Sequence, residues 1–255
     1  MKRLFGPVLF ALRHWWSREA LGLAAIEVGN TIILLAASGR LTRFFTDPYF
    51  MPFELMQMER ETNGLYMLLS IVTLPFVVAL VSRLNGRLFG RPLPVGPVEG
   101  AFRWAKAQIL GGLTLIAVIV IPYALVILVT KSVLPGAIDT IGATAAAIAV
   151  AAVFVLANLH IFYLMRVLYE GRSSFGAARR LSRGQRFTLP IRFLVLVAAI
   201  LAIGALFILP LLFAGDSRVL KLAMYLALNP LAATATVPIA VLFSRLYFEA
   251  EAAAR

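Results

Sequence analysis

The chain has 255 residues, of which 61% are hydrophobic and 14% are charged, and it carries a formal net charge of +12. Its mean hydropathy of +0.90 lies far outside the range of ordinary soluble domains and indicates an integral membrane protein. There is no cysteine, which excludes a disulfide framework, a thiol nucleophile and a thiolate metal site.

Apolar stretches along the chain are long enough to cross a bilayer core of about 30 Å, which takes roughly 20 helical residues. Segments of about ten residues with alternating polarity, which indicate a transmembrane barrel, do not occur. We therefore predict an all-α, polytopic bundle with six spans in three hairpins. The predicted spans are Ala20–Ser38, Leu65–Val81, Ile109–Val129, Ile141–Leu164, Ile191–Phe213 and Leu220–Phe243.

A short, basic, amphipathic segment precedes the first, third and fifth predicted spans, and the three segments resemble one another. They share an Ala-x-Arg triplet that ends at Arg13, Arg103 and Arg179. We expect each segment to form an interfacial elbow helix, with Trp15 and Trp16 of the first at headgroup depth. The repeat predicts one membrane domain, residues 1–255, built from three units at about 1–92, 93–169 and 170–255. The segments read GPVLFALRHWWSREALGL, GPVEGAFRWAKAQILGGL and SSFGAARRLSRGQRF.

Lys and Arg concentrate in alternate segments between the spans, starting with the N-terminal one. This positive-inside pattern places both termini in the cytoplasm, and we expect a multi-pass protein of a bacterial inner membrane. Attraction to anionic lipid explains the net charge better than nucleic-acid binding does. The predicted contacts with anionic lipid are Arg13, Arg18, Arg103, Lys106, Arg179, Arg180, Arg183 and Arg186.

The external segment 40–64, between the first two spans, is rich in Phe, Met and acidic residues. Turns are expected at Asp47-Pro48 and Met51-Pro52, and a short helix at Phe53–Thr62. Its aromatic side chains suit either a belt on the outer leaflet or a surface that binds a membrane protein partner.

Glu27 is an acid inside the first predicted span, and Asn30 follows it by about one helical turn. An acid at mid-span costs about 2.5–3.5 kcal/mol, so it normally faces the bundle interior and has a partner. Two interpretations stay open: a carboxylate that couples protons or binds a cation, and a structural clamp. The clamp's candidate partners are Asn158, His160 or a threonine of the sixth span.

Small and polar residues elsewhere in the spans indicate helix packing. Gly111-Gly112 predicts a close approach of two helices, and Ala143 and Ala147 predict packing in the centre of the bundle. Thr234 is expected to form an interhelical hydrogen bond. Prolines in several spans predict kinks, which occur both in transporters and in bundles that transport nothing.

The sequence offers almost nothing for catalysis. Its two histidines, His14 and His160, fall in different repeat units, and no HExxH or GxSxG motif occurs. We predict no catalytic residues, no cofactor and no metal site, because His160 has no second histidine nearby and there are no cysteines to assist it.

The stretch EGRSSFGAARRLSRGQRFTLPIR, residues 170–192, is followed by two spans and the terminal LFSRLYFEAEAAAR. This pattern, with its basic-Gly pair Arg183-Gly184, resembles the membrane domain attached to some bacterial glycerophosphoryl diester phosphodiesterases and related multi-pass proteins. The resemblance covers about the last 90 residues and is diffuse before them. It implies the membrane portion alone and brings no catalytic residue, because the phosphodiesterase barrel has no counterpart here.

Three functions are compatible with these patterns. The leading hypothesis is a non-enzymatic membrane module, a scaffold or accessory subunit, that binds lipid or a protein partner through its elbows and the segment 40–64. The alternative is a small transporter or permease subunit that uses Glu27 and Asn30. A lipid-modifying enzyme is the least favoured of the three functions, because the sequence contains no recognisable catalytic motif.

Overall fold

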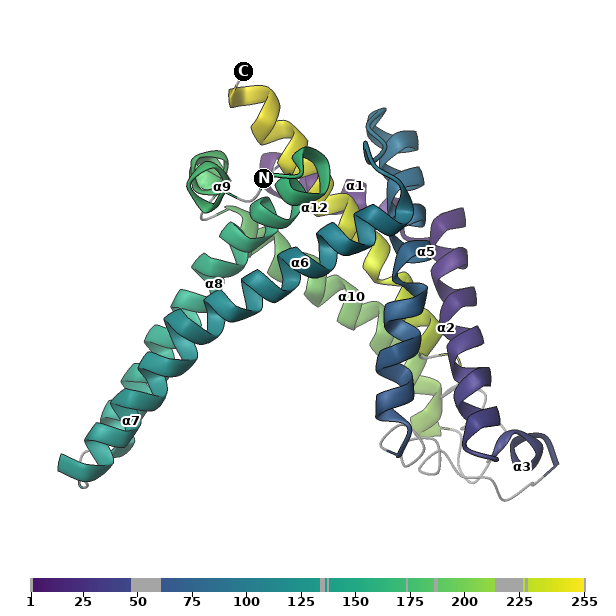
Figure 1. Cartoon of the computed structure of the whole chain (residues 1–255), viewed down its shortest axis with the longest axis horizontal. Helices are drawn as coiled ribbons and strands as arrows, with labels where there is room; N and C mark the ends of the chain where they lie inside the picture. The colour runs from purple at the N-terminus through teal and green to yellow at the C-terminus, as the bar shows by residue number, and fades with distance from the viewer. Residues whose placement is uncertain are drawn as a thin grey trace. The chain divides into compact units, whose positions relative to one another are not determined.

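A computed structural model describes residues 2–46, 61–133, 136, 138–172, 174–185, 188–213, 227 and 229–254. Throughout these residues the regular elements are helices, as predicted (Figure 1). They are α1 (Lys2–Arg13), α2 (Arg18–Ala37), α3 (Leu41–Thr46), α5 (Asn63–Phe89), α6 (Pro97–Leu115), the π-helix η1 (Ile116–Val120), α7 (Ile121–Val133), α8 (Ile138–Glu170), α9 (Phe175–Ser182), the 3-10 helix η3 (Arg183–Gln185), α10 (Thr188–Phe213) and α12 (Thr236–Ala254).

Five helical segments are long and apolar enough to cross a membrane, which confirms the prediction of a helical, multi-pass membrane architecture. They coincide with the first, second, third, fifth and sixth predicted spans. The fourth predicted span falls within the 33-residue helix α8. The five segments are Arg18–Ala37, Asn63–Phe89, Pro97–Val133, Thr188–Leu206 and Asn229–Ala254.

The chain forms two compact units. The first contains residues 1–93 and 192–242, and the second contains residues 94–191 and 243–255. Helices α10 and α12 therefore each begin in one unit and end in the other. The threefold division of the sequence stays a prediction.

Helices α2 and α5 pack against each other in the first unit. They meet where α2 has no side chain, since a Cβ atom at Gly22 would lie 3.0 Å from the methyl groups of Leu80. Ser17 begins α2 by accepting a hydrogen bond from the amide of Ala20 at 3.3 Å. At the same end of the pair, α5 ends at Gly90, whose φ of 65° is the left-handed conformation that favours glycine.

One ion pair lies at each end of the apolar part of the α2–α5 pair. Near one end, Arg87 donates to both carboxylate oxygens of Glu19, at 3.3 and 2.7 Å. At the other, Arg40 Nη1 lies 2.7 Å from Glu61 Oε2. Glu19 and Arg40 are separated by a chain length that spans about 30 Å as a helix, the thickness of a bilayer core. Glu19 also lies in the first turn of α2 and Arg87 in the last turn of α5, where the helix dipoles favour their charges.

Trp15 corrects the expectation that both tryptophans of the first elbow lie among lipid headgroups. Its side chain is only 2% exposed, and its Nε1 donates to Thr234 Oγ1 at 2.8 Å. Trp16 is 63% exposed. The periodicity that suggests a lipid-facing stripe thus includes residues that pack on the protein. Thr234, predicted to form an interhelical hydrogen bond, instead accepts this bond from a residue of the turn between α1 and α2.

In the second unit, α6, η1 and α7 form one continuous helical segment that runs antiparallel to α8 (Figure 1). Three contacts confirm the antiparallel direction, because later residues of one segment meet earlier residues of α8. Arg103 donates to the carbonyl of Leu168, and Gln108 forms a hydrogen bond with His160. A Cβ atom at Gly142 would lie 3.5 Å from the side chain of Ile127. The second elbow is therefore no separate helix, because no residue between Pro97 and Leu115 ends α6.

The alanine-rich face of α8 differs from its prediction. Ala143 and Ala147 are exposed in the described part of the chain, so the close contact on this stretch is made by the neighbouring Gly142.

The prolines of the described apolar stretches differ in their places. Pro238 is the third residue of α12, where a proline removes no helical hydrogen bond, because the amide there has no partner within the helix. Pro122 is the second residue of α7, which directly follows the π-helix η1 inside the continuous segment of α6, η1 and α7. Pro75 lies inside α5, which runs from Asn63 to Phe89. The kinks expected at these prolines stay a prediction.

The two partners of the Glu19–Arg87 ion pair differ in exposure, and this difference predicts unequal effects of mutation. The Glu19 side chain is 11% exposed and that of Arg87 is 51% exposed. Arg87→Ala should lower stability by about 2 kcal/mol, because a buried carboxylate loses its cation. Glu19→Gln should cost about 1 kcal/mol or less, because Arg87 can be hydrated. Thermal unfolding in mild detergent measures both.

The control is Arg83→Ala, since Arg83 is exposed on the same helix and forms no ion pair within the described residues. Equal losses of stability for the Arg87 and Arg83 variants would show that the pair does not hold α2 against α5.

Candidate functional site

The short helix α9 carries the densest group of exposed cations. We call Arg172, Arg179, Arg180 and Arg183 the basic surface, and all four are exposed. On the other side of α9, Ala177, Ala178 and Ser182 are buried. The helix packs on α8 with this small-residue face, so its arginines lie on the face turned away from the protein.

Specific contacts fix α9 in place. The rings of Phe175 and Tyr163 stack with centroids 4.1 Å apart and an interplanar angle of 4°. Ser174 caps the N-terminus by accepting a hydrogen bond from the Ala177 amide at 3.4 Å. At the other end, the Ser182 hydroxyl donates to the carbonyl of Arg179 at 3.1 Å. The ring stack therefore attaches α9 to α8, and the two serine hydrogen bonds stabilise the ends of α9 itself.

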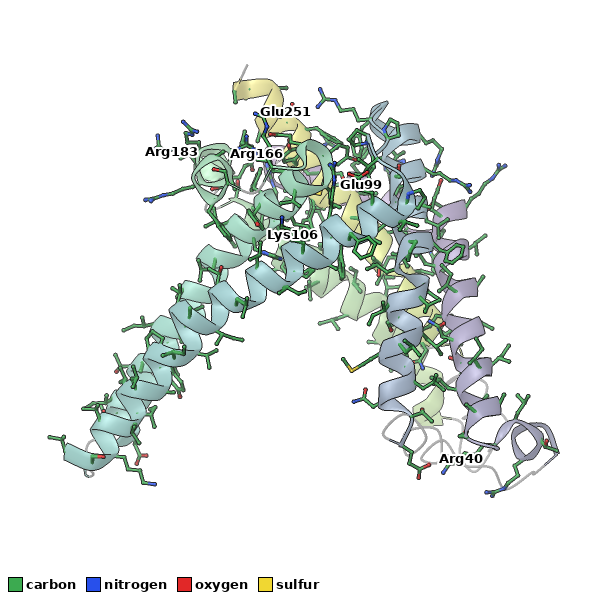
Figure 2. All side chains as sticks on the ribbon, in the orientation of Figure 1. Arg40, Glu99, Lys106, Arg166, Arg183 and Glu251 are labelled. Atoms are coloured by element: carbon green, nitrogen blue, oxygen red, sulfur yellow. The ribbon has the colours of Figure 1, made fainter. Side chains whose placement is uncertain are left out.

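Three carboxylates of the second unit, those of Glu99, Glu170 and Glu249, are already engaged with other cations. Glu99 accepts from Arg103, at 3.0 and 2.6 Å, and Glu249 accepts from Arg245 at 2.8 Å. Glu170 accepts from Arg166 at 2.7 Å and from the Tyr247 hydroxyl at 3.0 Å. Among the described residues, no carboxylate pairs with the basic surface. Figure 2 shows Glu99, Arg166 and Arg183 at the same end of the α6–α8 pair.

Aromatic rings surround the Glu170–Tyr247 hydrogen bond. Tyr247 is 1% exposed. Its ring lies 6.0 Å from Tyr169 and 6.5 Å from Phe162, and Phe248 lies edge-on to Tyr169 at 5.1 Å. This cluster fastens the end of α12 to α8. It holds Glu170 in place, away from any pairing with α9.

The other predicted lipid contacts divide into two groups. Arg13, Arg18 and Lys106 are exposed, as lipid contacts require, and Arg186 lies outside the described residues. Arg103 has a structural role instead. Besides binding Glu99, it donates to the carbonyl of Leu168 at 3.3 Å and lies against Gly171, whose φ is 68°. A cation at this position stabilises the C-terminal carbonyls of α8.

The polar residues of the first span lie in the first unit. Glu27 is half-buried near the middle of α2, and its carbonyl accepts from the Thr31 hydroxyl at 3.0 Å. Asn30, one turn later, is 4% exposed. Of the candidate clamp partners, Thr234 bonds Trp15. His160 bonds within the second unit, as described next.

His160 lies in the α6–α8 contact. Its Nε2 is 3.1 Å from Oε1 of Gln108, and its buried Nδ1 has no partner among the described residues. The ring occupies the space beside Gly111 so closely that any Cβ atom there would overlap it. The predicted close approach at Gly111 is confirmed, whereas Gly112 has no neighbour within 4 Å of an added Cβ. The side chain of Asn158 is not among the side chains that the structure describes.

Sequence reasoning missed a second recurring pattern, at the ends of α5, α8 and α12. In each helix an arginine precedes a buried apolar residue: Arg83 before Leu84, Arg166 before Val167, and Arg245 before Leu246. Four residues after these arginines stand Arg87, Glu170 and Glu249, the members of the ion pairs above. The spacing itself was the available signal, since residues four apart on a helix are neighbours.

Among the residues that the structure describes, no group of three or more His, Asp or Glu side chains is placed to hold a metal ion. The chain matches no protein-family model, no curated protein and no solved structure. Function is therefore inferred from the geometry of the basic surface and of the ion pairs described above.

The adjacent glycines of α6 supply a matched test of the His160 contact. Gly111→Ala should lower stability by about 1–3 kcal/mol, because the new methyl group overlaps the imidazole ring. Gly112→Ala should cost nothing measurable. Thermal unfolding in detergent compares them, and adding His160→Ala should remove much of the Gly111→Ala penalty. Equal stability of the two alanine variants would contradict this packing.

Proposed function

We propose that this chain is a non-enzymatic module of a bacterial inner membrane that binds anionic lipid through its basic surface. The observation that carries the proposal is the exposure of four arginines beside carboxylates that are already paired. Arg183 stands five residues before Thr188, where the membrane-length segment of α10 begins. This short distance supports a position of the arginines near the lipid headgroups.

The finer architecture belongs to the same proposal: six spans in three hairpins, interfacial elbows before the first and third hairpins, and both termini in the cytoplasm. The ion pairs that bound α2 and α5 support the placement of that hairpin across the bilayer. The concentration of Lys and Arg in alternate segments supports the orientation. The recurring arginines at the ends of α5, α8 and α12 support a threefold construction.

Helix α1 supports the elbow interpretation because it has two apolar faces. Val8 and Ala11 are buried on one face, and Trp15, in the turn that follows the helix, is buried as well. Phe5 and Leu9, which are 36% and 57% exposed, lie on a neighbouring stripe that points away from the protein. A helix lying in the interface needs such an arrangement, with one face on the protein and another in lipid.

The attraction of anionic lipid to each arginine near a membrane surface amounts to roughly 1 kcal/mol. Four exposed arginines on one short segment therefore provide a substantial local preference over zwitterionic lipid. Paired arginines such as Arg103 and Arg166 contribute little, because their partners neutralise them. Binding should weaken at high salt, since exposed charges are screened.

We also propose the relation of residues 170–255 to the membrane domain of glycerophosphoryl diester phosphodiesterases, in which a lipid-facing role is in keeping with the basic surface. The segment 40–64 is proposed to meet a membrane protein partner. Of that segment, residues 47–60 lie outside the described part, and α3 and Glu61–Gly64 flank them.

The direct test compares two double variants that each remove two positive charges. Arg179→Gln/Arg183→Gln should reduce retention of anionic lipid severalfold. Arg43→Gln/Lys131→Gln, at exposed positions in α3 and in the last turn of α7, should leave it unchanged. Native mass spectrometry of the purified protein with added phosphatidylglycerol and phosphatidylcholine measures retention. Unchanged retention in the first variant would refute lipid binding by α9.

Transport is the rival function, and one observation favours it: Glu27 is half-buried near mid-helix with the buried Asn30 one turn away. Proteoliposomes that contain a pH-sensitive dye, under an imposed potential, distinguish the two functions. Our proposal predicts no proton flux above that of empty vesicles. Flux that disappears in a folded Glu27→Gln variant would establish the rival.

A further inference from the structure

The basic surface consists of arginines alone. From residue 166 to residue 192 the sequence contains seven Arg and no Lys. Lysine would serve equally well for diffuse attraction to a charged membrane, whereas the guanidinium group presents a planar fork of donors that binds two phosphate oxygens at once. The composition of this segment thus favours recognition of phosphate over general attraction to negative charge.

The positions of the arginines on α9 suit a single headgroup. Arg179 and Arg183 are four residues apart on a backbone that stays helical through Arg183, so their side chains are neighbours on one face. Arg180 flanks them and is also exposed. The stacked Phe175 and Tyr163 rings hold the helix from behind. Two adjacent guanidinium groups on a fixed backbone lose little freedom when they close on one ligand.

The number of negative charges expected on the ligand follows from the positive charges of Arg179 and Arg183 that no carboxylate within the described residues neutralises. The carboxylate nearest in sequence, Glu170, is held by Arg166 and Tyr247. A phosphodiester headgroup brings one negative charge, which leaves the second guanidinium without a counter-charge. A phosphate monoester brings about −1.5 to −2 charges at pH 7 and three acceptor oxygens, which satisfy both.

We propose that Arg179 and Arg183 form a site selective for a lipid with a phosphate-monoester headgroup over singly charged phosphodiester lipids. The inference rests on the proposed function, because it assumes that α9 faces lipid. The source is a lipid and not a soluble phosphate, because Arg183 lies five residues from the start of the membrane-length helix α10. Acyl chains in the bilayer would then lie alongside the apolar surface of α10.

The test uses the full chain in mild detergent with equimolar dioleoyl phosphatidic acid, dioleoyl phosphatidylglycerol and dioleoyl phosphatidylcholine. Native mass spectrometry gives the amount of each lipid bound. The wild type should retain phosphatidic acid about tenfold over phosphatidylglycerol, as bidentate pairing with a doubly charged phosphate requires. Arg179→Lys/Arg183→Lys keeps the charge and should lose most of this ratio, while its preference for both anionic lipids over phosphatidylcholine persists.

The outcomes separate the two proposals. Phosphate-monoester recognition is overturned if the Lys variant keeps the wild-type ratio of bound phosphatidic acid to phosphatidylglycerol, or if the wild type binds the two lipids equally. Either result leaves general binding of anionic lipid standing. Undiminished anionic retention in Arg179→Gln/Arg183→Gln overturns both. Displacement of the bound lipid by millimolar glycerol 3-phosphate would assign the site to a soluble ligand instead. Thermal unfolding of each variant verifies that the fold is kept, as expected for exposed side chains.

Discussion

The low polarity of a bilayer core is the constraint on which the rest of this structure depends. A charge at its boundary must either pair with an opposite charge or reach water and headgroups. The α2–α5 pair shows the first solution at both ends, with Glu19 bound by Arg87 and Arg40 bound to Glu61. Between these ion pairs the helices are mostly apolar, with Glu27 and Asn30 among the polar exceptions on α2, over a length that matches the bilayer core.

The same constraint explains the distribution of charge in the second unit. Its carboxylates Glu99, Glu170 and Glu249 each bind an arginine, and these pairs hold helix ends together. Arginines outnumber these three acids, and within the described ranges Arg179, Arg180 and Arg183 are exposed without a paired carboxylate. A functional surface thus arises from the unequal numbers of the two charges, without any catalytic arrangement.

The sequence predicts most of the fold because hydropathy alone decides which segments enter a membrane. It failed where tertiary contacts, which are not local, decide the outcome. Trp15 and Trp16 are adjacent and chemically identical, yet only Trp15 meets Thr234, more than two hundred residues away. Arg103 and Arg179 occupy equivalent places in the repeat, but Arg103 alone lies beside the end of α8.

For the site, the sequence pointed to the arginines of α9, whose contact with lipid stays a prediction, but it did not reveal the contacts that leave them exposed. The pairing of Glu170 with Tyr247 joins α8 to α12, and no spacing within either helix reveals it. Gln108 was missed for the same reason, since its partner His160 lies on another helix. In contrast, the close approach at Gly111 was predictable, because a glycine pair inside an apolar helix usually marks a contact.

The most direct measurement of the central claim is the lipid content of the wild-type protein released from its own membranes and examined by native mass spectrometry. The account predicts anionic phospholipid bound in stoichiometric amount, because the arginines of α9 have no internal counter-charge. Protein that emerges bare, or with zwitterionic lipid alone, would contradict it.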